Sequence, residues 1–212
     1  MTSADCVVCG SNATAASPLR ADLVECRECG LVYRQNRFED PGEYSETYFV
    51  DGAYSDYSAE RDPIFRSARR RLGMLERAVS GRRLLDVGCA AGYFLEAARA
   101  RGWDVTGLEL SRYALERARE TDLPVHDGSI LAPPDFPPFD VITLWDTIEH
   151  LVEPVVALVN ARRLLRPNGV IAISTGDRKS VVAKVLGRRW RLLNDPTHNF
   201  FFDKNTLSRS TS

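Results

Sequence analysis

One short turn of the chain combines an acidic residue with small residues that leave the backbone accessible. Asp86 lies in an apolar run, and Gly88, Ala90 and Gly92 follow at alternate positions before a helical pattern begins. Such a turn lets a ligand lie against the main chain, and the amides that open a helix attract a carboxylate or phosphate. Because Asp86 can hold an ammonium group, the turn predicts a site for a ligand that carries both charges, as an amino acid does.

Polar residues at the ends of the next two predicted strands extend this site. Glu109 can accept hydrogen bonds from two ribose hydroxyls, and Asp127 with Ser129 can hydrogen-bond an adenine edge. A dinucleotide site would need the spacing G-x-G-x-x-G, whereas Ala90 and Tyr93 stand where its second and third glycines belong. An amino acid, a ribose and an adenine together predict S-adenosylmethionine as the cofactor.

Four cysteines form two pairs that each read C-x2-C-G, Cys6 with Cys9 and Cys26 with Cys29. This spacing is typical of zinc sites, and four thiolates leave no position for water, so the predicted zinc is structural. Residues 1–40 are therefore expected to form a zinc ribbon. That segment holds four arginines and six acids, hence 4 − 6 = −2, which argues against a nucleic-acid partner.

Strand and helix patterns alternate five times after residue 80, with predicted strands beginning near residues 84, 104, 124, 139 and 170. This alternation predicts an α/β fold with a doubly wound, mostly parallel, Rossmann-like sheet over 81–212, whose ligands bind beyond the carboxyl ends of the strands. Residues 41–80 are expected to form an aromatic linker or lid and an amphipathic helix. Arginines 66, 69, 70 and 71 of that helix are expected to be an exposed basic face.

Five segments resemble the class I S-adenosylmethionine-dependent methyltransferases: LLDVGCAAGYFL, VTGLELS, HDGSI, FDVITLWDTIEHL and LLRPNGVIAIST. With the cysteine pairs and a later P-x-H-x-x-F segment, they are similar to zinc-ribbon-bearing members that act on small molecules such as sugars, quinones or natural-product scaffolds. The resemblance implies the following cofactor contacts: Asp86, Gly88, Ala90 and Gly92 to the methionine part, Glu109 to the ribose, Asp127 and Ser129 to the adenine, and Trp145 and Asp146 beside the cofactor.

Methyl transfer from a sulfonium is an in-line displacement, so the protein has mainly to align donor and acceptor and exclude water. Where the acceptor must lose a proton, His150 is the predicted general base, because its reference pKa of about 6.5 suits neutral pH. The alternative is that His150 orients its own loop. Glu149 is expected to orient His150 or bind substrate. His198 and Tyr54 are candidate substrate contacts, with aromatic packing as the alternative for both.

The bulk composition of the 212 residues bounds the remaining possibilities. With 28 basic and 29 acidic residues the formal charge is −1, which gives no general attraction to nucleic acid or to an anionic membrane. There is no spanning apolar run and no signal-peptide pattern, so we expect a cytoplasmic protein whose partner is a small-molecule acceptor. The oligomeric state is left open.

The family's usual sheet has seven strands, and residues after 175 predict no sixth or seventh strand. We therefore expect either a fragment, with a C-terminally incomplete sheet, or a partner that covers the edge of the fifth strand. Two alternative functions remain open at this stage. One is an RNA methyltransferase that grips its substrate with the ribbon, and the other is a catalytically silent S-adenosylmethionine-binding protein.

Overall fold

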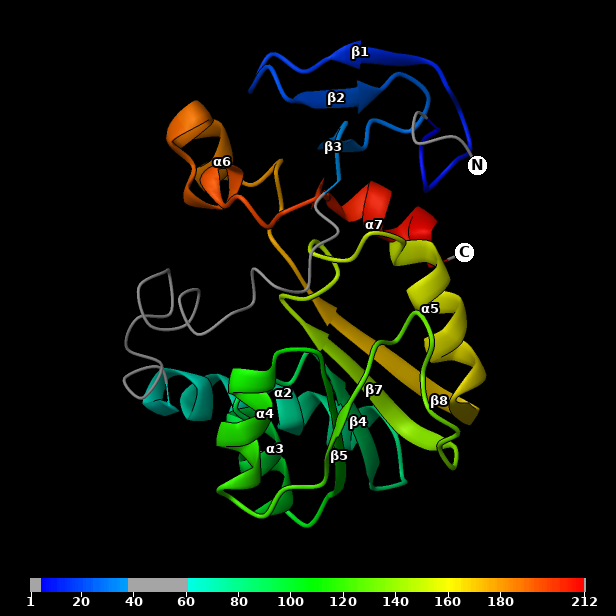
Figure 1. The fold of residues 1–212 in the computed structure, drawn as a ribbon, viewed down its shortest axis with the longest axis vertical. Coiled ribbons are helices and arrows are strands. Elements are labelled where there is room, and N and C mark those ends of the chain that lie inside the picture. The colour runs from blue at the N-terminus through cyan, green and yellow to red at the C-terminus, as the bar shows by residue number, and fades with distance from the viewer. Residues whose placement is uncertain (1–4, 38–60, 212) are drawn as a thin grey trace. The chain divides into compact units, whose positions relative to one another are not determined.

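A computed structural model describes residues 5–37 and 61–211 (Figure 1). These residues form two compact units, which we treat separately. The sheet unit comprises residues 61–145 and 160–173, and the ribbon unit comprises residues 5–37, 146–159 and 174–211. None of the described helices has both the length and the apolar character needed to cross a bilayer.

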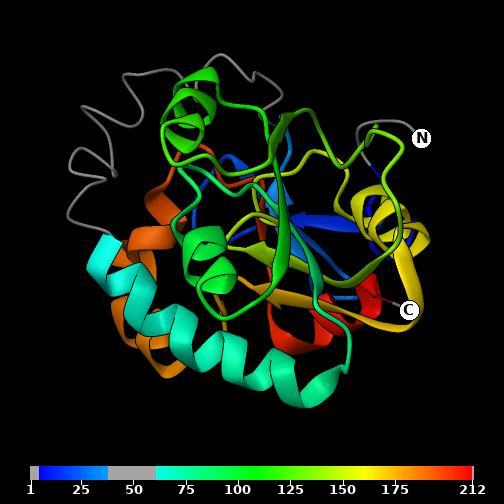
Figure 2. The same cartoon turned by 90° about the horizontal axis from the view of Figure 1, so that it is seen from below.

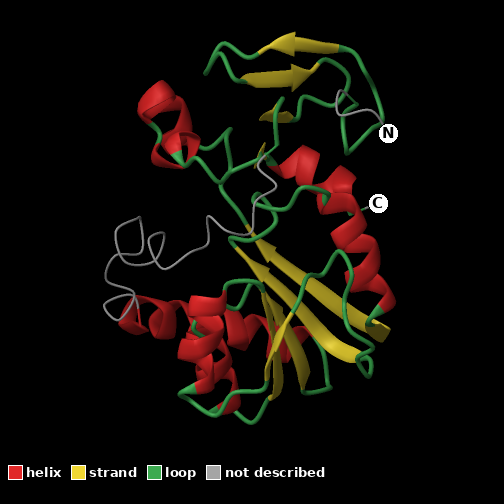
Figure 3. Cartoon of the chain, in the orientation of Figure 1, coloured by secondary structure: helices red, strands yellow, loops and turns green. Residues whose placement is uncertain are grey.

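The sheet unit contains the predicted doubly wound sheet. Its strands lie in the order β6-β5-β4-β7-β8, and β4 pairs in parallel with both β5 and β7. The third strand in sequence lies at one edge and the fifth at the other, as the α/β prediction requires. The strands are β4 (Arg83–Val87), β5 (Asp104–Glu109), β6 (Val125–Asp127), β7 (Phe139–Trp145) and β8 (Leu165–Ser174), the arrows in the lower part of Figure 3. The predicted fold class is confirmed.

Helices α2 (Arg61–Ala78) and α3 (Tyr93–Arg99) share a core with the sheet. α2, the long cyan helix of Figure 2, buries Ala68, Leu72 and Leu75 on one stripe at helical spacing. α4 (Arg112–Arg119) is capped by Ser111, whose hydroxyl accepts a hydrogen bond from the Ala114 amide. α5 (Pro154–Arg163) is followed by β8, which starts at Leu165, ahead of the expected position near 170.

The ribbon unit is built on a second, antiparallel sheet in the order β1-β2-β3-β9. Within the ribbon, β2 (Leu23–Cys26) and β3 (Val32–Arg34) form an antiparallel hairpin, with β1 (Thr14–Ala16) beside β2. The fourth strand, β9 (Phe200–Phe201), comes from the far end of the sequence and pairs with β3. Residues 174–211, which we expected to belong to the methyltransferase domain, therefore cluster with the N-terminal ribbon.

The segment after β8 is divided into several short helical pieces. α6 (Val181–Leu186) stops at Gly187, whose φ of 51° is left-handed, and two 3-10 turns follow, η2 (Gly187–Arg189) and η3 (Arg191–Asn194). α7 (Lys204–Ser210) begins after Asp203, whose side chain caps it by accepting from the Asn205 and Thr206 amides. Among the described residues, no strand joins the parallel sheet beyond β8.

Candidate functional site

The turn between β4 and α3 has the open backbone that its sequence predicts. Gly88, Ala90 and Gly92 all have left-handed φ values, of 69°, 47° and 80°. The Gly88 amide donates to the Leu108 carbonyl at 2.8 Å, which joins the turn to β5. A Cβ at Gly92 would lie 2.6 Å from a Leu123 methyl, so only glycine fits there without movement. The small residues thus bring the main chain of the turn close to its neighbours.

Glu109 holds this turn in place through backbone hydrogen bonds. Its Oε2 accepts from the Ala90 amide at 2.8 Å, and its Oε1 accepts from the Leu110 and Ser111 amides, both at 2.9 Å. Burial raises the pKa of Glu109, and these amides oppose the shift because they favour the charged form. The sequence predicted a ribose contact for Glu109, and the structure adds an anchoring role that fixes Ala90 in its left-handed conformation.

Asp86 is a buried acid in the middle of the sheet. Its Oδ1 accepts a 2.6 Å hydrogen bond from the Thr143 hydroxyl on the adjacent strand β7. Burial raises the pKa of Asp86 to about 7, although the Thr143 hydrogen bond and the positive charge of Arg71 oppose that shift. A carboxyl group this costly to bury gains from a cation, so the surroundings of Asp86 suit the ammonium group predicted for its ligand.

Arg71 corrects one sequence expectation. We expected it to lie on an exposed basic face, but it is half-buried and its guanidinium lies over the Trp145 ring, 4.3 Å from the ring centre. Trp145 also meets Phe94 edge-on, with ring centres 5.4 Å apart. The sequence signal was available, because position 71 is three residues after buried Ala68 and therefore lies beside the apolar stripe of α2.

Asp127 and Ser129 lie at the carboxyl end of β6. Asp127 is exposed and stands opposite Glu109 in the register of β5 and β6. The Ser129 hydroxyl accepts from the Leu131 amide at 3.1 Å and so stabilises the following turn. The sheet therefore brings Asp86, Glu109 and Asp127 to the carboxyl ends of neighbouring strands, where parallel sheets bind ligands.

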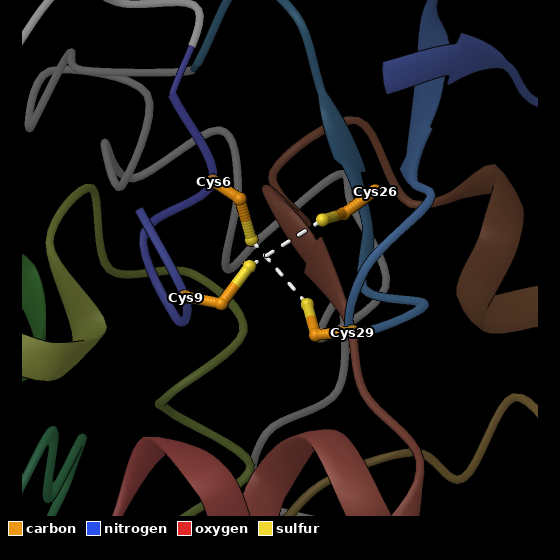
Figure 4. A group of neighbouring side chains, drawn as sticks. All are labelled: Cys6, Cys9, Cys26 and Cys29. Carbon is orange, nitrogen blue, oxygen red and sulfur yellow. Dashed lines mark hydrogen bonds between the residues drawn. The ribbon is translucent and has the colours of Figure 1, made fainter. Parts of the chain in front are cut away.

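The four paired cysteines converge in the ribbon unit (Figure 4). Their sulfurs all lie within 4.8 Å of one another, and the Cys6–Cys29 and Cys9–Cys26 sulfurs are 3.5 Å apart. Tetrahedral zinc with Zn–S bonds of about 2.3 Å separates its sulfurs by roughly 3.8 Å, so this arrangement fits one metal ion. Gly10 and Gly30, the glycines after each pair, have left-handed φ values of 69° and 78°, as the expected bends require.

A second cluster in the ribbon unit contains three predicted residues, Glu149, His150 and His198. Their side chains lie within 4.8 Å of one another, and the two imidazole rings meet edge-on with centres 4.6 Å apart. The Asn199 and Phe200 amides both donate to the Glu149 carbonyl, at 2.8 and 3.1 Å, which holds the two segments together. Sequence positions separated by about fifty residues thus form one polar group.

The titration behaviour of this cluster follows from its burial. Burial raises the pKa of Glu149 to about 8 and lowers that of His150 to about 4, with the nearby His198 adding to the decrease. Burial also lowers the pKa of His198. At neutral pH the two rings are uncharged and Glu149 is largely protonated. Its buried Oε2 has no hydrogen-bond partner among the described residues.

This shift predicts how Glu149 affects stability. Between about pH 5 and 8 the folded protein keeps the Glu149 proton and the unfolded chain does not, so unfolding releases a proton and rising pH favours it. The free energy of unfolding of the parent, minus that of Glu149→Gln, should therefore fall by about 1.4 kcal/mol per pH unit in that window and level off above pH 8. Urea unfolding of both proteins from pH 6 to 9 measures it; a difference that does not change with pH would contradict the raised pKa.

Several residues that contact this cluster or its backbone were not predicted. The Arg34 side chain, from β3, donates to the His198 carbonyl at 2.9 Å and to the Asp195 carbonyl at 3.1 Å. Asp195 and Thr197 contact the histidines directly, and no spacing in the sequence pointed to them.

Asp146 is exposed, with a left-handed φ of 52°. Tyr54, the other candidate substrate contact, lies outside the described residues.

Comparison with known proteins places these observations in a family. The methyltransferase-domain family matches residues 57–210 of the chain. The chain is 34% identical over 178 residues to a ubiquinone biosynthesis O-methyltransferase of Alkalilimnicola ehrlichii, which covers 78% of this chain and 66% of that protein. It is 31% identical over 191 residues to the protein of that name from Idiomarina loihiensis, covering 81% of this chain and 78% of the relative.

The fold has a counterpart among solved structures. A SAM-dependent methyltransferase from Thermotoga maritima matches with a TM-score of 0.59 over 75% of each chain, at 21% sequence identity. At 21% identity this similarity supports the fold alone.

Proposed function

Because the chain belongs to the methyltransferase-domain family, we propose that it transfers a methyl group from S-adenosylmethionine to a small-molecule acceptor. One observation carries the proposal: a left-handed, small-residue turn after β4 is anchored by Glu109 at the end of the neighbouring strand, beside buried Asp86. When bound, S-adenosylmethionine supplies a methyl group on a positively charged sulfur. The chain's residues have to bind it, align the acceptor and take the acceptor's proton.

The donor set fits such a cofactor. Asp86 would take the ammonium group, and the small residues Gly88, Ala90 and Gly92 would let the methionine part lie against the main chain. Glu109 Oε1 already accepts from two backbone amides, whereas Oε2 accepts from one and keeps a second lone pair for a ribose hydroxyl. Asp127 and Ser129 would contact the adenine, and Trp145 and Asp146 would lie beside the cofactor. Arg71, over the Trp145 ring, would add a positive charge that already acts on Asp86.

We propose a hydroxyl as the accepting group, because the relatives at 34% and 31% identity are named O-methyltransferases. A hydroxyl has to lose its proton during transfer. His150 is the proposed base, since its ring is neutral at pH 7 and belongs to the segment that directly follows β7. Glu149, with its unpartnered Oε2, and His198 are the proposed acceptor contacts. The candidate acceptors are phenols of the quinone type, sugars and natural-product scaffolds.

We also propose that Cys6, Cys9, Cys26 and Cys29 hold a structural zinc ion. Four sulfurs close the coordination sphere, so the metal would stabilise the ribbon and take no part in the chemistry. The ribbon segment carries more acids than arginines, which supports a small molecule over RNA as the acceptor.

Calorimetry followed by a transfer assay tests the function. We expect S-adenosylmethionine and S-adenosylhomocysteine to bind, and labelled methyl groups to pass to a catechol or sugar acceptor from a panel. Transfer to structured RNA instead would favour the RNA enzyme. Binding of the cofactor with no transfer to any acceptor would favour the silent binding protein, and absence of cofactor binding would refute the proposal.

A further inference from the structure

Asp195, Thr197 and His150 form a continuous hydrogen-bonded chain in the ribbon unit. The Thr197 hydroxyl oxygen lies 2.6 Å from Asp195 Oδ1 and 3.0 Å from His150 Nδ1. The Thr197 amide donates to the same Asp195 oxygen at 3.0 Å, which fixes the threonine relative to the acid. Thr197 is buried, with 1% of its surface exposed, so water does not substitute for either contact.

The position of the protons follows from counting donors along this chain. A hydroxyl has one proton, and a carboxylate only accepts. At 2.6 Å from Asp195 the Thr197 hydroxyl must direct its proton at the acid, because two acceptors this close would repel. The remaining contact, to His150 Nδ1, then requires the ring to be the donor. A neutral ring that carries its proton on Nδ1 has its lone pair on Nε2.

We propose that Asp195 and Thr197 are positioning residues that hold His150 as the Nδ1–H tautomer, with Nε2 as the atom that takes the acceptor's proton. The inference deepens the proposed function and rests on it. In the transfer step the acceptor oxygen forms a bond to the methyl carbon while the carbon–sulfur bond breaks and sulfur keeps the electron pair. The hydroxyl proton moves to Nε2, so the positive charge passes from sulfur to the imidazolium, which then releases the proton to solvent.

The chain also stabilises the charge that this step creates. Burial and the neighbouring His198 both disfavour a charged His150, whereas Asp195 and the Thr197 backbone favour it. Asp195 itself stays ionised, because its hydrogen bonds from Thr197 and the nearby histidines outweigh its burial and lower its pKa. An imidazolium at position 150 would thus face one negative charge through a single hydroxyl, whereas the adjacent His198 would disfavour it.

His198 is less suited to take the proton. Its Nδ1 lies 2.9 Å from the Leu192 carbonyl, which only accepts, so this ring also carries its proton on Nδ1. Its Nε2 lies 3.7 Å from Asp195 Oδ2, beyond hydrogen-bond distance. A proton bound to that nitrogen would therefore face Asp195. We assign His198 the role of disfavouring a charge on His150 before the transfer step.

Matched substitutions at position 197 test the proposal. Thr197→Val keeps the shape and removes the hydroxyl, whereas Thr197→Ser keeps the hydroxyl. With saturating S-adenosylmethionine, we expect Thr197→Val to lower kcat by about 10- to 100-fold, a part of what a general base contributes. Thr197→Ser should stay within about 3-fold of the parent, and the cofactor Kd of both variants should be unchanged, because the general-base step and not cofactor binding uses the hydroxyl.

A spectroscopic measurement on the parent protein makes the test independent of activity and of variant folding. Nitrogen-15 NMR of labelled histidine should show the His150 proton on Nδ1, and Thr197→Val should shift the population toward Nε2–H. An Nε2–H tautomer in the parent, or full kcat in Thr197→Val, would overturn the proposal. A second bound metal ion beyond the cysteine site would also overturn it, because Nε2 would then be a ligand. If no acceptor is methylated but His150 carries its proton on Nδ1, the proposed function is wrong and the assignment of Asp195 and Thr197 as residues that fix the tautomer still holds.

Discussion

Replacing Glu109 with alanine should lower the affinity for S-adenosylmethionine by more than about 100-fold and destabilise the sheet unit by about 2–4 kcal/mol. Three backbone amides donate to this one carboxylate, and hydrogen bonds to charged groups contribute about 1.5–3 kcal/mol each. Without it the Ala90 amide loses its partner, and only a long contact from the Cys89 thiol to the Ala90 carbonyl, at 3.8 Å, is left among the described contacts to hold this residue at a φ of 47°. Calorimetric titration and urea unfolding measure the two effects.

Two controls separate anchoring from general charge effects. Glu109→Gln keeps one acceptor oxygen, so its losses should be smaller than those of Glu109→Ala. Asp127→Asn removes a charge from the end of the neighbouring strand, but that carboxylate is exposed and should change stability very little. If Glu109→Ala bound the cofactor as the parent does, both the anchoring role and the ribose contact would be wrong.

Removing the metal should unfold the ribbon unit while leaving cofactor affinity nearly intact. Cys26→Ser deletes one of four ligands at the end of β2, and structural zinc sites supply on the order of 10 kcal/mol of folding free energy to small modules. β3 would then lose its fixed partner, and with it Arg34 and the β9 pairing that hold residues 195–201. The residues proposed to bind S-adenosylmethionine belong, except for Asp146, to the sheet unit.

We therefore expect Cys26→Ser to retain cofactor Kd within about 3-fold and to lose methyl transfer, because the His150 cluster depends on the ribbon. Metal analysis should give one zinc per chain for the parent and for Cys89→Ala, the matched control, since Cys89 is buried in the sheet unit and does not belong to the four-cysteine group. Full zinc content in Cys26→Ser, or a parent without zinc, would refute the assignment.

The parallel sheet could be predicted because its signals are local. Strands such as β4 and β7 are apolar runs that end at a turn, and Ser111 and Asp203 mark helix starts with side chains that cap the first turn. The bends after the cysteine pairs could be predicted in the same way, since Gly10 and Gly30 adopt the left-handed φ that these bends require. Motifs of this kind carry their structural reason within a few residues.

The polar cluster around His150 could be predicted only in part. His150, Glu149 and His198 stood out by type, but the roles of Asp195 and Thr197 depend on a contact between segments about fifty residues apart. Arg34 contacts residues more than 160 positions away, which no periodicity encodes. Arg71 was misjudged for a simpler reason: a run of arginines suggested a solvated surface, and the aromatic ring that covers Arg71 comes from a distant strand.

The pairing of β3 with β9 has a consequence for how the chain folds. Tyr33 pairs with Phe200, so the contact closes a loop of 167 positions, from 200 − 33. Contacts of such high sequence separation form late, because the entropy of loop closure has to be overcome first. The ribbon's first three strands can form as soon as they leave the ribosome, whereas its fourth strand cannot pair until Phe201 has been synthesised. The cluster of Glu149, His150 and His198 therefore assembles later in synthesis than the first three strands of the ribbon.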